Sequence, residues 1–344
     1  MALRPCTPCA MVKFSPVIEA APEPRRTESM ATPRTAFLIL AHTQPEVLLR
    51  LCRALETFPV LVHVDAKSNL AAFRSDRFSP QVSFIENRVR VHWGGWSVVE
   101  ATLRLIERAL DLIPPVRRFV LLSGTCFPTR SVHNLDRFLD KAPYRNLIRA
   151  AALHEAGRAQ QARLTRYWWF DQFDIVARRY STSDVAKLIM RKGLEWSTWP
   201  FRKDPNLFRD LITPSMGSQW WSLDRDCAKY VVETFRNNPD LVEFFRTSFA
   251  PDEIAIHSVI RASRFAAETS ALEPWPKNGV AGLANLHLID PSLTKTFDEE
   301  DYPRIRSTEC WFVRKIALPR SAALIERLEA DLKKDLQSGG LYQA

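Results

Sequence analysis

The sequence predicts an α/β protein with a mostly parallel central sheet flanked by helices. From Thr35 onward, short apolar runs typical of buried strands alternate with amphipathic stretches of helical period. Strands separated by helices pair in parallel through right-handed crossovers. The composition is that of a globular protein, since 46% of the 344 residues are hydrophobic and 25% are charged. We therefore expect ligands at the carboxyl ends of the strands.

The first half of the chain supplies the regular strand and helix pattern. The expected strands are Thr35–Ala41, Val60–Val64, Val82–Ile85 and Arg118–Leu122. Pro45 opens a helix whose inner face carries Leu48, Leu51, Cys52 and Leu55. A second helix is expected from Ser97 to about Leu112, with a capping box of Ser97 and Glu100 at its start and Pro114-Pro115 at its stop.

The second half is less regular. Residues 151–213 are rich in Trp, Arg and Tyr and show no clear period. The expected elements beyond them are a strand at Ser218–Leu223, a helix at Asp224–Phe235, a helix at Asp252–Ala262, a short strand near Leu286–Ile289 and a helix at Ala317–Leu332. The pattern divides the chain into a flexible leader (1–34), one domain (35–319) with halves at 35–150 and 151–319, and a C-terminal helix and tail (320–344).

The charge balance indicates an anionic partner. The 48 Lys and Arg exceed the 39 Asp and Glu, so the net charge is +9, of which the leader holds only +2. Such a surface attracts phosphates, nucleic acid or anionic lipid. Apolar runs such as Ala36–Ala41 are too short to span a membrane, and no signal peptide is recognisable. We expect a cytoplasmic protein, with a peripheral position at a membrane surface as a hypothesis.

Several common motifs are missing from the sequence. It contains no GxGxxG, P-loop, HExxH or GxSxG pattern, and its six cysteines do not form paired CxxC motifs. Asp224-Arg225-Asp226 has the DxD form by which many nucleotide-sugar enzymes hold a divalent cation. Because it lies at the start of an expected helix, we interpret it as a helix cap. No metal ion or other cofactor is expected.

Three groups of charged residues are candidates for chemistry, each with a plain structural alternative. Asp65 follows a buried strand directly and could hold a base or ribose, or form an ordinary Asx turn. Asp252 and Glu253 lie at the start of an expected helix, where Glu253 could act as a general base or as a cap. Arg314-Lys315 could neutralise a diphosphate leaving group or form a surface pair.

Taken in order, these pieces resemble the Core-2/I-branching glycosyltransferase family, which includes branching β-1,6-N-acetylglucosaminyltransferases and peptide O-xylosyltransferases. The matching stretches are Ile39-Leu40-Ala41-His42, Val62-His63-Val64-Asp65-Ala66-Lys67-Ser68, Trp93-Gly94-Gly95-Trp96, Leu121-Leu122-Ser123-Gly124-Thr125-Cys126-Phe127-Pro128, Gly217-Ser218-Gln219-Trp220-Trp221, Pro251-Asp252-Glu253 and Phe312-Val313-Arg314-Lys315. Their order along the chain is the strongest part of the resemblance.

The resemblance implies a GT-A-type fold and inverting, metal-independent transfer of a sugar, GlcNAc or xylose first, from a UDP-sugar to an acceptor hydroxyl. By position, Glu253 is similar to the catalytic base and Arg314 with Lys315 to the diphosphate clamp. Asp65, Lys67 and Trp93 are similar to donor-binding residues, and Ser218, Gln219, Trp220 and Asp252 to residues of the sugar or acceptor pocket. The first half would then bind the nucleotide and the second half the acceptor, a glycan, a lipid-linked molecule or a protein.

The chain also departs from the family pattern. Cys126 stands where an acidic residue is common, and His287 stands at the position of a further phosphate-binding arginine, which suggests a weaker or pH-sensitive clamp. A degenerate member that binds carbohydrate without transferring it therefore stays open. A non-catalytic binder of nucleic acid or another polyanion is a second alternative, given the arginines and aromatic residues in Arg163–Arg179. We do not expect nucleic acid as a partner, because this alternative leaves Glu253 unexplained.

Overall fold

A computed structural model describes residues 34–112, 116–173 and 182–337. The chain divides into two units, Met1–Thr32 and Pro33–Ala344, and every described element belongs to the second unit. The expected leader apart from Arg34, the Pro114-Pro115 stop and residues 338–344 of the tail lie outside the described residues.

The central sheet has five strands in the order β3-β2-β1-β4-β8. These are β1 (Thr35–Ala41), β2 (Val60–Val64), β3 (Val82–Phe84), β4 (Arg118–Ser123) and β8 (Ser222–Asp224). The pairs of β1 with β2, β1 with β4 and β2 with β3 are parallel, and β8 runs antiparallel to β4. The expected α/β fold with a mostly parallel sheet is therefore confirmed.

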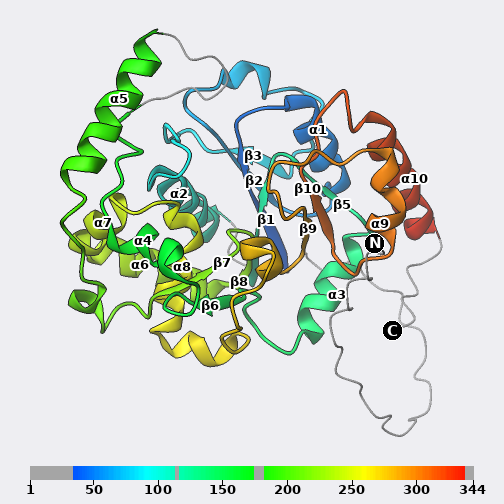
Figure 1. The fold of residues 1–344 in the computed structure, drawn as a ribbon. Coiled ribbons are helices and arrows are strands. Elements are labelled where there is room, and N and C mark those ends of the chain that lie inside the picture. The colour runs from blue at the N-terminus through cyan, green and yellow to red at the C-terminus, as the bar shows by residue number, and fades with distance from the viewer. Residues whose placement is uncertain (1–33, 113–115, 174–181, 338–344) are drawn as a thin grey trace, which may run out of the picture. The chain divides into compact units, whose positions relative to one another are not determined.

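Helices cover both faces of this sheet (Figure 1). Side chains alternate along β1, so that Ala36 and Leu38 lie in one core and Phe37 and Ile39 lie in another. The first core includes α2 (Ser97–Leu112), α6 (Arg225–Asn237) and α8 (Ala255–Arg261), and the second includes α1 (Pro45–Ala54) and α3 (His133–Lys141). Burial on both faces explains why β1 reads as an unbroken apolar run.

Two smaller sheets complete the fold. One joins β5 (Cys126–Pro128), β10 (Phe312–Arg314) and β9 (His287–Ile289), and the other pairs β6 (Ala150–Ala152) with β7 (Ser215–Gly217). The last described helix, α10 (Ala322–Gln337), packs Leu324, Ile325 and Leu328 against Phe127 and Val313 of the three-stranded sheet. The remaining α-helices of the described residues are α4 (Arg158–Thr165), α5 (Thr182–Ser197), α7 (Pro239–Arg246) and α9 (Tyr302–Arg306).

The first-half elements follow the sequence prediction closely, but the strand expected at Ser218–Leu223 is wrong. The chain leaves β7 after Gly217 and enters β8 only at Ser222. The two strands belong to different sheets, because β7 pairs with β6 and β8 pairs with β4. Trp220 and Trp221 are buried in the turn between them, so the apolar run reflects burial and not a continuous strand.

Two helix starts also differ from the prediction. The helix expected at Asp252–Ala262 is divided into a 3₁₀ turn, Pro251–Glu253, and α8, with Ile254 between them. The helix expected from Ala317 begins at Ala322, after Pro319. There the Ser321 hydroxyl accepts a hydrogen bond from the Ala317 N–H and donates one to the Phe297 carbonyl.

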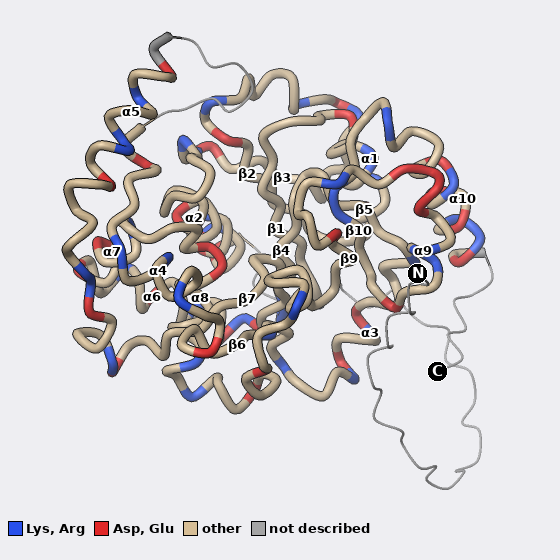
Figure 2. Tube along the Cα trace, viewed as in Figure 1, with Lys and Arg blue, Asp and Glu red and all other residues tan. Residues whose placement is uncertain are grey.

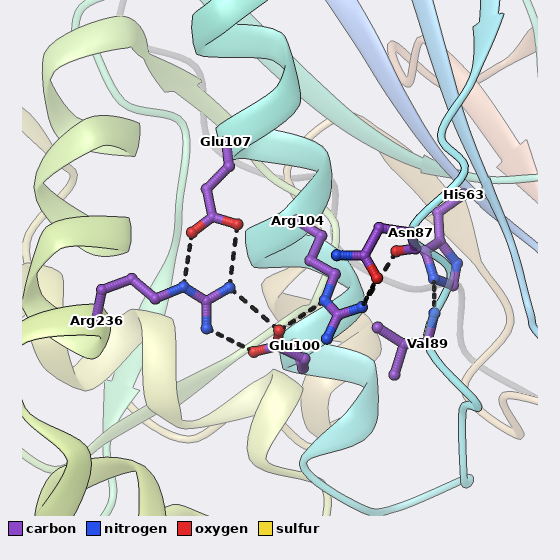
Figure 3. Close-up of polar contacts among 7 residues, drawn as sticks. All are labelled: His63, Asn87, Val89, Glu100, Arg104, Glu107 and Arg236. Atoms are coloured by element: carbon purple, nitrogen blue, oxygen red, sulfur yellow. Dashed lines mark hydrogen bonds and ion pairs between the residues drawn. The ribbon is translucent and has the colours of Figure 1, made fainter.

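The capping box expected from Ser97 and Glu100 is wrong. The Ser97 hydroxyl accepts the His92 N–H and donates to Asp171. The Glu100 carboxylate accepts hydrogen bonds from Arg104 at 2.8 Å and from Arg236 at 2.7 Å (Figure 3). Glu100 thus links α2 to α6 and does not reach back to the start of its own helix.

Charged residues of both signs are interspersed over the described elements (Figure 2). The positive charge of the described unit is therefore not confined to one segment. Within the described residues, no helix combines the length and the apolar character needed to cross a bilayer.

Candidate functional site

The carboxyl ends of three central strands meet at one edge of the sheet. The Asp65 N–H donates to the Ala41 carbonyl at 2.8 Å, and the Gly124 N–H donates to the Leu40 carbonyl at 2.8 Å. A β-carbon added at Gly124 would lie 3.0 Å from the Ala41 β-carbon, so the two loops are in close contact. The end of β10 joins them, since the Ile316 N–H donates to the Thr125 carbonyl.

Asp65 anchors the loop after β2. One oxygen of its carboxylate accepts the Lys67 N–H at 2.9 Å and the Val91 N–H at 3.2 Å, and the other lies 3.9 Å from the Lys67 ammonium. The bond to Lys67 is the Asx turn considered from the sequence. Asp65 thus fixes two loops at the strand edge, and a role in holding uridine stays a prediction.

The loop that reaches Asp65 is itself held by β2. His63 accepts the Val89 N–H at 2.8 Å through its ring (Figure 3). Burial lowers the pKa of His63 to about 4, so its ring is neutral and can accept this bond. This contact positions the segment that leads to Trp93.

Arg314 projects from the end of β10 beneath this edge. Its guanidinium donates to the hydroxyls of Ser123 at 2.6 Å and Thr125 at 2.8 Å, and it lies 4.6 Å from the centre of the Trp220 ring. Both hydroxyls are neutral, and no carboxylate of the described residues forms an ion pair with Arg314. The guanidinium is therefore held in place by two neutral hydroxyl groups.

Lys315 adds a second cation next to it. Burial and the neighbouring Arg314 lower the pKa of Lys315, because a second positive charge disfavours protonation. Within the described part of the chain, the Lys315 ammonium has no ion-pair partner. Two adjacent cations without a counter-ion favour the binding of an anion here.

His42 lies among the same groups. Desolvation and the Arg314 guanidinium lower the pKa of His42, Asp65 opposes this shift, and Lys315 and Lys67 add to it. The His42 imidazole therefore lies within electrostatic range of charged residues at the ends of both β2 and β10. This places Asp65, Lys67, Arg314 and Lys315 within electrostatic reach of a single point.

Glu253 lies in the 3₁₀ turn before α8 and is paired with Arg163 of α4. The Arg163 guanidinium donates to the Glu253 carboxylate at 2.6 Å, and their side chains are only 14% and 18% exposed. Arg163 also lies 4.9 Å from the centre of the Phe249 ring. Sequence reasoning missed Arg163, because 90 residues separate it from Glu253 and no local pattern marks it.

The loop with Trp93 supports this turn. The Ala250 N–H donates to the Gly94 carbonyl at 2.8 Å. Gly94 has a φ of +81°, and an added β-carbon would lie 2.9 Å from the Phe249 ring, so this position requires glycine. Trp93 is 78% exposed, and the edge of its ring meets Phe249 and Phe170.

The two carboxyl groups of the turn have perturbed acidities. Burial, followed by the neighbouring Glu253, raises the pKa of Asp252, while Arg163 and Arg314 oppose that rise. Burial also raises the pKa of Glu253, against the opposing effect of Arg163. Perturbed carboxyl groups of this kind are typical of functional sites.

Asp252 also connects the carboxyl pair to the cation pair. Burial lowers the pKa of Arg314, and Cys126 and then Asp252 oppose this shift, so Asp252 and Arg314 lie within electrostatic range of each other. The structure therefore brings Asp252 together with Arg314, although 62 positions separate them in the sequence, counted from 252 to 314. The candidate base is the next residue after Asp252.

The pocket residues expected from the sequence lie close to Arg314. Trp220 is buried beneath the guanidinium, and its backbone N–H donates to the Ser218 hydroxyl at 3.4 Å. Gln219 is half-buried between them. Their contact with a sugar stays a prediction.

The two residues that depart from the family pattern, His287 and Cys126, are both buried and uncharged. His287 is buried and stacks on Phe312 at 5.3 Å, and burial followed by Arg314 lowers its pKa to about 3. His287 is therefore neutral at pH 7, and not partly charged as the sequence suggested. Cys126 is also buried, and burial raises the pKa of its thiol to about 11. Neither side chain brings charge to the site near neutral pH.

Asp224 has the capping role expected from the sequence. Its carboxylate accepts the Cys227 N–H at 2.7 Å at the start of α6. Across the described residues, no group of three or more His, Cys, Asp or Glu side chains is arranged to hold a metal ion.

Three further residues of the site were not singled out from the sequence. Ser123 and Thr125 hold Arg314, and His42 lies among the charged groups. All three follow the ends of apolar strands, where polar residues of a parallel sheet gather. Their position at strand ends was a usable signal.

Comparison with known proteins identifies relatives. Residues 35–199 match the model of the family described as "Branch: Core-2/I-Branching enzyme". The chain is 23% identical over 267 residues to "Xylosyltransferase oxt" of Drosophila melanogaster, which covers 73% of this chain and 27% of that protein. It is 22% identical over 324 residues to "Xylosyltransferase 2" of Bos taurus, which covers 89% of this chain and 34% of that protein.

A third relative belongs to the branching enzymes. The chain is 26% identical over 224 residues to "Beta-1,3-galactosyl-O-glycosyl-glycoprotein beta-1,6-N-acetylglucosaminyltransferase 3" of Homo sapiens, which covers 63% of this chain and 45% of that protein. The chain thus spans less than half the length of each of these curated relatives. The resemblance stated from the sequence motifs is confirmed.

Proposed function

We propose that this chain, whose residues 35–199 match the Core-2/I-branching enzyme model, is an inverting glycosyltransferase of GT-A type. The donor is a UDP-sugar, with UDP-GlcNAc or UDP-xylose as the first choice, and the acceptor is a hydroxyl of a glycan, a lipid-linked molecule or a protein. The names of the relatives support xylosyl or N-acetylglucosaminyl transfer.

One observation carries this proposal. It is the electrostatic proximity of the half-buried Asp252, next to Glu253, and Arg314, next to Lys315, which supports a single site for the carboxyl pair and the cation pair. Sugar transfer needs a base at the acceptor and positive charge at the leaving group. The arrangement supplies both within one region at the strand edge.

In the proposed reaction, Glu253 accepts the proton of the acceptor hydroxyl. The acceptor oxygen forms a bond to the anomeric carbon from the side opposite UDP, and the bond between that carbon and the β-phosphate oxygen breaks. The electron pair of the broken bond leaves with UDP, whose charge Arg314 and Lys315 stabilise. Ser123 and Thr125 hold the Arg314 guanidinium in a fixed orientation, so little reorganisation is needed.

Arg163 and Asp252 assist the base in this scheme. The ion pair at 2.6 Å favours the ionised form of Glu253, which burial alone would disfavour. Burial favours the protonated form of Asp252, which could then donate a hydrogen bond to a sugar oxygen. Asp65 and Lys67 would contact the uridine end of the donor, and Trp93 would lie at its sugar side.

We further propose that no metal ion takes part. Two cations can neutralise a diphosphate in place of a divalent ion. The DxD sequence at Asp224 is used as a helix cap, which supports this view.

The test is a donor screen with the full chain. UDP release from UDP-GlcNAc, UDP-xylose, UDP-glucose and UDP-galactose is measured with and without EDTA. We expect UDP release from UDP-GlcNAc or UDP-xylose at a rate that EDTA leaves unchanged. Loss of activity with EDTA would contradict the metal-independent scheme. UDP binding without release from any donor would instead indicate the degenerate, sugar-binding alternative, and salt-dependent RNA binding without UDP binding would indicate the polyanion binder.

A further inference from the structure

Helix α5 presents an apolar face to the solvent. Val185, Ile189 and Trp196 recur at helical spacing and are 43%, 66% and 80% exposed, and Met190 beside them is 63% exposed. We call these four side chains the apolar face of α5. Large apolar residues gathered on one exposed helix face mark an interaction surface.

Three charged residues of α5 lie on the side that packs on the protein, whereas the Lys192 side chain is 60% exposed beside the apolar face. Asp184 is buried, and Arg191 and Glu195 are paired at 3.6 Å with side chains only 14% and 11% exposed. The Arg191 guanidinium lies 4.3 Å from the centre of the Phe170 ring, so this side packs on the protein. A helix that only covers its own core has the reverse pattern, with apolar residues inside and charges outside.

The apolar surface continues beyond the end of the helix. Trp199 and Phe201 are 53% and 63% exposed. The guanidinium of Arg166 lies 3.2 Å from the centre of the Trp199 ring, and that of Arg202 lies 5.9 Å from it. Tryptophan rings next to arginines are typical of the interface between lipid headgroups and acyl chains, where the ring is part apolar and the cation meets phosphate.

The positive charge of the chain favours an anionic bilayer over a second copy of the chain as the partner of this surface. The chain carries a net charge of +9. A second copy would bring the same positive charge against it, whereas an anionic bilayer has the opposite charge. Figure 1 shows α5 at the margin of the described elements, apart from the strands of the central sheet. Its four apolar side chains are between 43% and 80% exposed among the described residues.

We propose that the apolar face of α5, together with Trp199 and Phe201, docks this protein on an anionic lipid bilayer. The apolar side chains enter the boundary between headgroups and acyl chains, and Arg166 and Arg202 remain at the phosphates. None of the residues of this surface is among those assigned to the candidate site, so the proposal does not depend on the proposed reaction.

The test is co-sedimentation of the full chain with vesicles. Vesicles of phosphatidylcholine, with or without phosphatidylglycerol, are used at low and physiological salt. We expect binding to the anionic vesicles that weakens as salt rises. The double variant Ile189→Ser with Trp196→Ser should lower the partition coefficient roughly tenfold or more, because two deeply inserting side chains are lost.

A matched control separates this effect from a general loss of surface hydrophobicity. Leu336→Ser on α10 removes a side chain that is 54% exposed and lies outside the surface, and it should leave vesicle binding unchanged. Quenching of tryptophan fluorescence by brominated lipid should also fall in Trp196→Phe, which keeps the apolar character of the position.

Three results would overturn the proposal. The first is no binding to anionic vesicles, and the second is equal binding with and without phosphatidylglycerol. The third is a dimer, seen by sedimentation velocity, that the double variant converts to a monomer, since the surface would then take a second copy. Because the substituted side chains are exposed, the thermal unfolding of each variant should match that of the parent protein, which checks folding.

Discussion

Replacing Arg163 by methionine removes the cation that lies 2.6 Å from the candidate base while keeping most of the length of the side chain. Glu253 would then be left in a site where burial alone raises its pKa above the ordinary value of 4.5. A neighbouring arginine typically lowers a carboxyl pKa by roughly 1–3 units. We therefore expect the variant to raise the pKa of Glu253 by about that amount.

The expected effect on activity follows from this shift. A general base works only in its ionised form, so the acidic limb of the profile of kcat/KM against pH should move upward by about 1–3 units. Below the limb, each unit corresponds to roughly a tenfold loss. UDP release from the preferred donor, measured between pH 5 and pH 9, should fall steeply at low pH and recover toward the parent value at high pH.

The variant should lose stability at high pH, whereas its loss of activity appears at low pH. The folded pKa of Glu253 lies above its unfolded value, so its ionisation opposes folding as pH rises through that unfolded value. Removing Arg163 increases this penalty. The variant should thus have nearly the same free energy of unfolding as the parent near pH 4 and be less stable by about 1–3 kcal/mol at pH 8. This figure is smaller than that for a fully buried pair, because both side chains are partly exposed.

Arg236→Met is the matched control. Arg236 pairs with Glu100 and Glu107 and joins α6 to α2 (Figure 3). It should lower stability without moving the acidic limb. If correctly folded Arg163→Met protein has the acidic limb of its pH profile at the same pH as the parent, Arg163 does not shift the pKa of Glu253 and the reasoning fails.

Two further predictions concern the donor and the DxD sequence. Lys315→Ala should weaken UDP binding, measured by calorimetry, roughly 10- to 100-fold, because a charged contact with phosphate contributes about 1.5–3 kcal/mol. The control Lys229→Ala, on the exposed side of α6, should leave the affinity for UDP unchanged. Equal affinity for UDP in both variants would refute the diphosphate clamp. Asp224→Ala should lower the free energy of unfolding by about 1 kcal/mol through loss of the cap, and Asp224→Asn should largely retain it. Both Asp224 variants should keep full transferase activity under native conditions. Loss of activity in both would instead indicate that Asp224 is a metal ligand.

Much of the first half of the fold was predictable because its signals are local. The strand Thr35–Ala41 was found with both boundaries and the next helix with its start at Pro45, since a buried parallel strand is a continuous apolar run and proline marks a helix start. The cap at Asp224 was predictable for the same reason, because its partner is only three residues away.

The second half was less predictable because its contacts are distant in sequence. The run Ser218–Leu223 is apolar throughout, yet it passes from one sheet to another, and only the pairing partners reveal this. Likewise α5 was not expected, because residues 151–213 show no clear period in the sequence. The structure shows that its apolar side faces the solvent.

The candidate site shows both situations. Glu253, Arg314 and Asp65 were identified through the order of the motifs, and the structure places Arg314 within reach of Asp252. Arg163 escaped notice, because its importance comes only from its position in space beside Glu253. Ser123 and Thr125 were part of a quoted motif, but their contact with Arg314 could be seen only in three dimensions.

The central claim is that Glu253 acts on the acceptor while the cations hold UDP, and Glu253→Gln tests it most directly. Gln keeps the size of the side chain but cannot take the acceptor proton, so we expect transfer to fall by roughly 10²–10⁴-fold with the affinity for UDP unchanged. Glu243→Gln, at a side chain that is 65% exposed on α7, should retain full transfer. Undiminished transfer by Glu253→Gln would contradict the account.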